Sequence, residues 1–174
     1  ATMLDLLKVA GKDVIAVGKI FDIFDGEGVT EKIKTTGNTN GIAFTKALQT
    51  RDFDGLAFIN LVDFDMLYGH RRDVAGYAAA ATEFDRFVAD FIPEMREGDL
   101  LMVTADHGCD PSYTKTTDHT REYVPYLIYG KGVKPGVDLG THLCFGTIAQ
   151  TICEYLDVDA SSLDGKSVWN EIKA

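Results

Sequence analysis

The feature that most constrains the fold is a regular alternation between short apolar runs of strand length and longer segments with helical periodicity. The clearest apolar run covers residues 56–62, Leu-Ala-Phe-Ile-Asn-Leu-Val, and is typical of a strand buried on both faces. Further strands are predicted at residues 14–18, 100–105 and 123–129. Strands that alternate with helices predict an α/β fold, with a mainly parallel sheet and helices on both of its faces.

Helices are predicted between these strands, at residues 3–10, 41–50, 77–91 and 144–156. The first begins with a capping box formed by Thr2 and Asp5. The third ends near Pro93, because proline disturbs the helical hydrogen bonds. The stretch from Lys19 to about Asn40 is rich in glycine and polar residues, so we expect loop there with little regular structure.

Composition limits the partners that such a chain can have. The 174 residues are 45% hydrophobic, which is enough for one ordinary core, and the net charge is −10. Nucleic acid and anionic membrane surfaces are therefore not expected as partners. No apolar run approaches the length of a membrane span, and the N-terminus has no signal-peptide pattern. Three cysteines without a Cys-x-x-Cys pair favour a reducing compartment, so we expect a cytoplasmic protein.

Acidic and imidazole side chains gather in three clusters beside predicted strands. The clusters are Asp63, Asp65 and His70 after the strand at 56–62, Asp106 and His107 after the strand at 100–105, and Asp118 and His119 before the strand at 123–129. A single Asp or His at a strand end is usually a cap or a solvated side chain, but three such clusters together favour a metal site. The mixture of imidazole nitrogen and carboxylate oxygen suits zinc, manganese or iron.

The site in an open α/β sheet lies beyond the carboxyl ends of the strands. We therefore expect the side chains of these clusters to converge at that edge of the sheet.

The same segments resemble the signature of the phosphopentomutase family. The matching runs are Asn60–Asp65 with Gly69–Asp73, Thr104–Gly108, Thr117–Pro125 and, near the start, Gly18–Phe24. Together they distinguish this family from other members of the alkaline phosphatase superfamily, which share the Asp-His-Gly theme more loosely. The resemblance implies that residues 1–174 form the carboxy-terminal part of an alkaline-phosphatase-like core, without the cap domain and the first part of the core. A helix that begins at residue 3 without an initiating Met also suggests truncation.

The resemblance also implies an activity and a set of metal ligands. Phosphopentomutases interconvert ribose 1-phosphate and ribose 5-phosphate, and their 2-deoxy counterparts, in nucleoside salvage, through a phosphothreonine that bridges two Mn²⁺ ions. The implied ligands of one ion are Asp65, His70 and His119. Asp106 and His107 are implied for the other, whose third ligand, an Asp, lies outside this chain together with the nucleophilic threonine. The isolated chain is thus expected to be inactive and to bind one metal ion tightly, with zinc or another divalent ion able to replace manganese in vitro.

Several neighbouring residues have more than one interpretation. Lys19 follows a predicted strand and could bind a sugar phosphate, although an exposed lysine at a strand end is the commoner case. Asp63 and Asp118 either fix turns or accept hydrogen bonds from an imidazole. Cys109 is expected to be a small buried residue rather than a metal ligand, and His142 to be a surface or loop residue.

Two alternatives to the phosphopentomutase interpretation remain. One is another two-metal enzyme of the same superfamily, either a phosphatase or a cofactor-independent phosphoglycerate mutase. The other is a metal-binding module without catalytic activity. The expected partners are a pentose phosphate and the remainder of the parent enzyme. An incomplete core should also leave apolar surface uncovered, so the isolated chain is expected to self-associate or to bury that surface in a partner.

Overall fold

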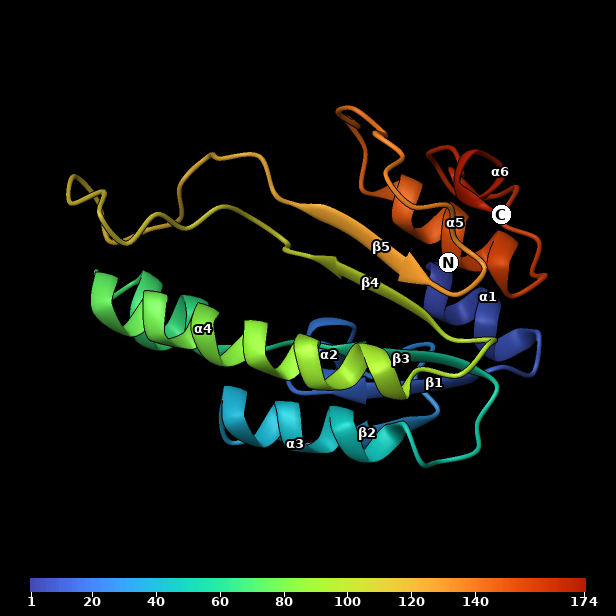
Figure 1. The fold of residues 1–174 in the computed structure, drawn as a ribbon, viewed down its shortest axis with the longest axis horizontal. Coiled ribbons are helices and arrows are strands. Elements are labelled where there is room, and N and C mark those ends of the chain that lie inside the picture. Colours follow the sequence, from blue (N-terminus) through green and yellow to red (C-terminus); the bar gives the residue numbers. More distant parts are fainter. The chain divides into compact units, whose positions relative to one another are not determined.

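The computed structural model describes all residues from 1 to 174, which form two compact units (Figure 1). The first unit contains Ala1–Lys34, Asp52–Ile59 and Gly132–Ala174, and the second contains Thr35–Arg51 and Asn60–Lys131. None of the helices combines the length and the apolar character that crossing a membrane requires.

A parallel sheet of three strands forms the centre of the first unit. The central strand β1 (Asp13–Val17) pairs in parallel with β2 (Glu31–Ile33) on one side and with β3 (Gly55–Ile59) on the other. Residues 14–17 are each at most 1% exposed, so both faces of β1 are covered. The sequence-based prediction of a parallel sheet is therefore confirmed for these strands, although β3 ends three residues earlier than expected.

Helix α1 (Met3–Val9) begins at the predicted capping box, in which the Thr2 N–H donates to Asp5 Oδ2 at 2.6 Å. The apolar face of α1 packs with alternate residues of β1 in one core, which contains Leu4, Leu7, Val14, Ala16 and Ile20. The helix predicted near the end of the chain is present as α5 (Gly146–Tyr155). A further short helix, α6 (Trp169–Ile172), was not predicted.

The prediction of loop from residue 19 to 40 is wrong, because this stretch contains the short helix α2 (Ile20–Ile23) and the strand β2. Both depend on contacts with other segments. The Lys32 ammonium binds Asp22 at 2.7 Å and lies 3.8 Å from the centre of the Phe21 ring. The Thr30 hydroxyl accepts a hydrogen bond from the Val14 N–H at 2.8 Å and donates one to the Val14 carbonyl at 3.1 Å. Local composition does not reveal contacts of this kind.

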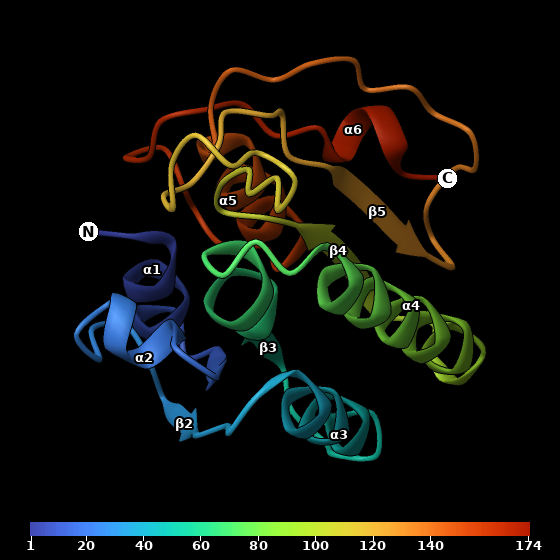
Figure 2. The same cartoon turned by 90° about the vertical axis from the view of Figure 1, so that its left-hand side faces the viewer.

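Two helices lie side by side in the second unit, α3 (Asn38–Leu48) and α4 (Val74–Phe91) (Figure 2). Hydrogen bonds at the two ends of α3 join it to α4, since Thr39 Oγ1 donates to Glu83 Oε1 at 2.7 Å and Gln49 Nε2 donates to the Phe91 carbonyl at 2.8 Å. As predicted, α4 stops before Pro93, which lies in the single 3₁₀ turn η2 (Ile92–Glu94).

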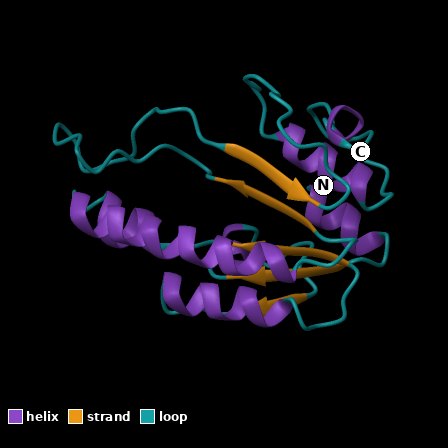
Figure 3. Ribbon diagram, in the orientation of Figure 1, coloured by secondary structure: helices purple, strands orange, loops and turns teal.

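The remaining strands, β4 (Leu100–Thr104) and β5 (Tyr126–Gly130), pair with each other in antiparallel register. Both strands were predicted, but the expectation of a mainly parallel sheet does not hold for this pair. Parallel neighbours need a crossover connection, usually a helix. Residues 105–125 form a loop instead, so the chain returns beside β4 in the opposite direction (Figure 3).

Candidate metal centre

The first candidate ligands lie on an unusual turn, η1 (Phe64–Gly69), which has the hydrogen bonding of a π-helix. In this turn the His70 N–H donates to the Asp65 carbonyl, five residues earlier, at 2.9 Å. A bond that closes over five residues places residue 70 one turn beyond residue 65 on the same side of the helix. The two side chains meet, with His70 Nε2 3.3 Å from Asp65 Oδ2.

The other candidate ligands come from the loop between β4 and β5. Asp106 and His107 follow β4, and the loop returns so that the Thr120 N–H donates to the Gly108 carbonyl at 3.1 Å. A Cβ atom at Gly108 would lie 2.8 Å from the Glu122 backbone nitrogen, so a side chain at this position would separate the two arms of the loop. The close pairing stacks the rings of His107 and His119, with their centroids 3.7 Å apart.

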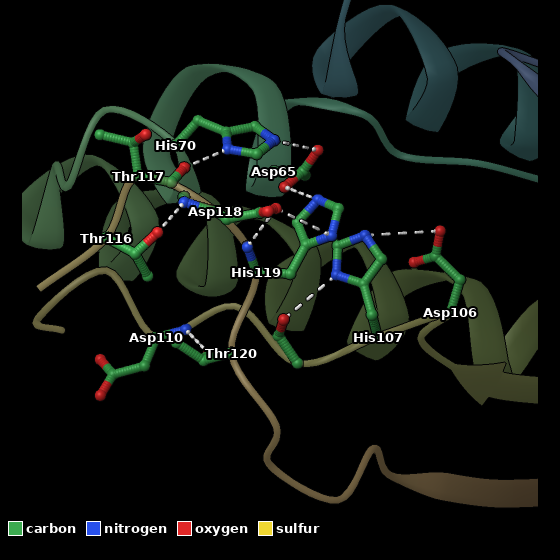
Figure 4. A network of polar contacts seen from close by, with 12 residues as sticks. Asp65, His70, Asp106, His107, Asp110, Thr116, Thr117, Asp118, His119 and Thr120 are labelled. Atoms are coloured by element: carbon green, nitrogen blue, oxygen red, sulfur yellow. Dashed lines mark hydrogen bonds and ion pairs between the residues drawn. The ribbon is translucent and has the colours of Figure 1, made fainter.

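The structure brings four of the five predicted residues together around the Asp65 carboxylate (Figure 4). His119 Nε2 lies 3.4 Å from Asp65 Oδ1, and one ligand atom from each of Asp65, His107 and His119 lies within 4.8 Å of the others. Asp106 lies at the margin, since its side chain is 71% exposed and its Oδ2 is 3.7 Å from His107 Nε2. Four of the five residues thus converge within the second unit, but they do so on η1 and on the loop between the antiparallel strands β4 and β5, and not at the carboxyl edge of one parallel sheet. Their role as metal ligands stays a prediction.

Hydrogen bonds fix the orientation of the imidazoles. His70 Nδ1 lies 2.5 Å from the Thr117 carbonyl oxygen, and His107 Nδ1 lies 3.1 Å from the Gly108 carbonyl oxygen. Because a carbonyl only accepts, these contacts require hydrogen on Nδ1, so in the neutral ring the lone pair is on Nε2. All three Nε2 atoms lie beside a carboxylate, as is typical of histidines that bind a metal through one nitrogen and are held by the other.

The charge of Asp65 lacks sufficient compensation from the protein. Its Oδ1 atom is buried and accepts no hydrogen bond, even though His119 Nε2 is the nearby nitrogen. Leaving a buried carboxylate oxygen without a partner is costly, and a cation at this position would remove that cost. The donor set of two carboxylates and three imidazoles therefore fits a divalent transition metal.

The geometry and the family resemblance group these ligands differently. The resemblance joins Asp65 with His70 and His119, whereas the three side chains that lie within 4.8 Å of one another include His107 in place of His70. Asp65 and His119 belong to both groupings. The division of the five residues between two ions accordingly stays a prediction.

The neighbouring acidic residues have structural roles. Asp63 accepts a hydrogen bond from the Asn38 N–H at 2.7 Å, at the start of α3, while its own N–H donates to Asn38 Oδ1 at 2.9 Å. A carboxylate at this end of a helix interacts favourably with the helix dipole. Asp118 accepts from the His119 N–H at 2.8 Å, and this hydrogen bond holds the pKa of Asp118 below its usual value.

The other residues considered from the sequence lie apart from the cluster or contribute weakly to it. Cys109 is partly buried against Gly69, and burial together with the charge of Asp65 raises the pKa of its thiol, which disfavours the thiolate that binds metals. His142 is exposed in a loop, as expected. Lys19 is exposed at the start of α2 in the first unit, and its ammonium has no ion pair.

Sequence reasoning missed two residues that support this region. Asn38 forms the reciprocal pair with Asp63, and Arg72 donates hydrogen bonds to backbone carbonyls of the loop that carries His119. Arg72 lies next to Arg71 in the Gly69–Asp73 run, directly after His70. Nothing in the order of residues indicates which of the two has a partner.

Comparison with known proteins finds a match to a family of metalloenzymes. The family model described as the Metalloenzyme superfamily matches residues 8–160. Among curated relatives, the phosphopentomutase of Acetivibrio thermocellus is 52% identical over 171 residues, which are 98% of this chain and 44% of that protein. The phosphopentomutase of Carboxydothermus hydrogenoformans is 47% identical over 99% of this chain and 44% of its own length. The chain thus spans less than half of the length of these relatives.

A solved structure supports the fold. The structure of Leishmania mexicana phosphoglycerate mutase, determined at low cobalt concentration, superposes on this chain with a TM-score of 0.68. The superposition covers 90% of this chain and 37% of the mutase chain. The sequences are 20% identical, so this likeness concerns the fold alone.

The partnerless oxygen of Asp65 generates a prediction about stability. In metal-stripped protein, the free energy of unfolding of Asp65→Ala should lie within about 1 kcal/mol of that of the wild type, because the change removes a half-buried carboxylate whose Oδ1 has no hydrogen bond. Adding Mn²⁺ at a hundred times its dissociation constant should stabilise the wild type by about 2.7 kcal/mol and the variant hardly at all. Thermal unfolding with and without Mn²⁺ measures both effects. Asp85→Ala, on the exposed face of α4, is the control, and equal stabilisation of Asp65→Ala by Mn²⁺ would contradict the metal interpretation.

Proposed function

Since this chain belongs to the Metalloenzyme superfamily, we propose that it is the metal-binding, carboxy-terminal part of a phosphopentomutase. The observation that carries this proposal is the Asp65 carboxylate, which has one buried oxygen without a hydrogen bond and lies among three imidazoles, all within the segments that resemble the phosphopentomutase signature. The parent enzyme would interconvert (deoxy)ribose 1-phosphate and (deoxy)ribose 5-phosphate. We assign this reaction to cytoplasmic nucleoside salvage, and three free cysteines agree with a reducing compartment.

In the parent enzyme, Asp65, His70 and His119 would hold one Mn²⁺, and Asp106 and His107 would supply two ligands of a second. Such ions, when bound, stabilise negative charge on a phosphoryl group and orient it for displacement. The residues of this chain would neutralise and hold the ions, and the Nδ1 hydrogen bonds of His70 and His107 would leave Nε2 as the ligand atom of each ring. Lys19, which is exposed and has no ion pair, would neutralise the substrate phosphate.

The chain by itself would lack activity, because the threonine that carries the phosphoryl group in this family is not among its residues. Phosphoryl transfer depends mostly on positioning and charge, so a metal without the nucleophile does not replace it. A phosphoglycerate mutase is the closest alternative within the superfamily. It is disfavoured because relatives that are 47% and 52% identical carry the phosphopentomutase name, whereas the phosphoglycerate mutase structure is only 20% identical.

Assays of mutase activity test this proposal. The full-length parent should convert ribose 1-phosphate to ribose 5-phosphate, and the 174-residue chain should not. Asp65→Ala in the parent should abolish turnover. A parent protein without mutase activity but with phosphoglycerate mutase activity would support the alternative enzyme, and one without either activity would support a non-catalytic module.

Metal stoichiometry gives a second prediction. Three protein ligands can hold a metal whose shell is completed by water, whereas two rarely suffice. Calorimetric titration of the metal-stripped chain should therefore give about one tight Mn²⁺ per chain, abolished in His70→Ala and nearly unchanged in His107→Ala. Zinc should bind more tightly than manganese. If His107→Ala removes tight binding and His70→Ala does not, the geometric grouping of Asp65, His107 and His119 is the correct one.

An apolar face on the β4–β5 pair motivates a third prediction. Leu127 and Tyr129 alternate along β5 and so share one face, on which they are 62% and 44% exposed. Val103 and Leu101 lie opposite them on β4. In the parent enzyme, we propose that this face is covered by the part of the polypeptide that the chain lacks, which is more than half of the length of the relatives.

In the isolated chain, a second copy should take the place of this missing part, because exposed apolar faces favour association. Light scattering at increasing concentration should show a molecular mass above that of one chain. Leu127→Lys should reduce the association, and Val9→Lys, which changes an exposed residue on α1, should not. A strictly monomeric wild type at high concentration would contradict the prediction.

A further inference from the structure

Arg72 occupies an unusual backbone conformation between η1 and α4. Its φ angle is +56°, in the left-handed region that few residues other than glycine adopt. The turn ends η1, since the Arg72 N–H donates to the Gly69 carbonyl at 3.1 Å, and α4 begins directly afterwards with Asp73 as its N-cap. An arginine is not needed to make this turn, because glycine would form it with less strain.

The hydrogen bonds of the Arg72 side chain explain why an arginine is found at this position. Nε donates to the Thr116 carbonyl, one terminal nitrogen donates to the carbonyls of Gly69 and Asp110, and the other donates to those of Thr116 and Asp118. The five distances lie between 2.5 and 3.2 Å. A guanidinium has five N–H donors, so every one of them is used. No donor is left for a phosphate or a carboxylate.

These hydrogen bonds hold the part of the loop that presents two of the imidazoles. Thr117 lies between two of the carbonyls that Arg72 binds, and its own carbonyl contacts His70 Nδ1. His119 immediately follows Asp118, whose carbonyl accepts from Arg72. The guanidinium therefore connects the turn that carries His70 to the loop that carries His119, across 44 to 46 residues of sequence.

We infer that Arg72 is a positioning residue for the metal centre, which acts by tying residues 110–118 to η1 and not by binding substrate. The inference rests on the proposed metal function. Groups behind metal ligands typically change metal affinity by about 10- to 100-fold when they are removed. The left-handed conformation makes a clean test possible, because Arg72→Gly removes the guanidinium while it relieves the backbone, whereas most other substitutions would keep the backbone strain.

The experiment compares Arg72→Gly and Arg72→Lys with wild type, and uses Arg71→Lys as the matched control, since Arg71 is the exposed neighbour. Amide hydrogen exchange in metal-stripped chain is measured at Thr116, Thr117, Asp118 and His119, and Mn²⁺ affinity is measured by calorimetry. Both Arg72 variants should exchange faster at these amides and bind Mn²⁺ about 10- to 100-fold more weakly, without loss of the cooperative thermal transition. Arg72→Lys should not restore wild-type amide exchange or Mn²⁺ affinity, because a single ammonium cannot reach four carbonyls. Arg71→Lys should behave as wild type.

Two results would overturn the inference, and a third separates it from the proposed function. Unchanged exchange in the Arg72 variants would show that the guanidinium does not hold the loop. Faster exchange with unchanged Mn²⁺ affinity would show that the loop is held but that its order does not position the ligands, which leaves the metal function intact. If wild type binds no Mn²⁺ at all while the Arg72 variants exchange faster, the proposed function fails, and with it the role of Arg72 toward the metal.

Discussion

The uncompensated charge of Asp65 is the constraint on which the arrangement of the second unit depends. Its carboxylate lies between the Nε2 atoms of His70 and His119, yet one oxygen accepts no hydrogen bond. A protein that maximised only its own stability would pair that oxygen or replace it with an apolar group. Here the surrounding hydrogen bonds orient nitrogen lone pairs and leave the negative charge available. The region is therefore organised for binding a cation, at the expense of its intrinsic stability.

The sequence predicted the parts of the structure that local patterns control. Apolar runs located β1, β3, β4 and β5, and a helical period ending near proline located α4. The five candidate ligands were found because acidic residues and histidines stand directly beside those runs. The role of Asp63 was not predicted, since its carboxylate accepts from the Asn38 N–H at the start of α3 and not from an imidazole.

The parts that were not predicted depend on partners distant in sequence. Strand β2 is three residues long and is stabilised by pairing with β1, so its own residues carry little signal. The direction of β5 follows from the loop before it, because an apolar run is the same for parallel and antiparallel strands. The π-type turn that joins Asp65 to His70 and the left-handed conformation of Arg72 are backbone features without a sequence pattern. Sequence reasoning identified the candidate ligands but not the contacts that orient them.

The long loop between β4 and β5 has a consequence for the order in which the molecule folds. The contacts that assemble the candidate centre span 44 to 47 residues, from the turn after β3 to Thr116, Thr117 and Asp118. Closing so large a loop costs chain entropy before any ligand contact forms, so these contacts should belong to the late stages of folding. During synthesis, the helix pair of α3 and α4 can form while the His119 codon is still untranslated. A metal ion that needed ligands from both η1 and this loop could then be captured only after His119 had been synthesised.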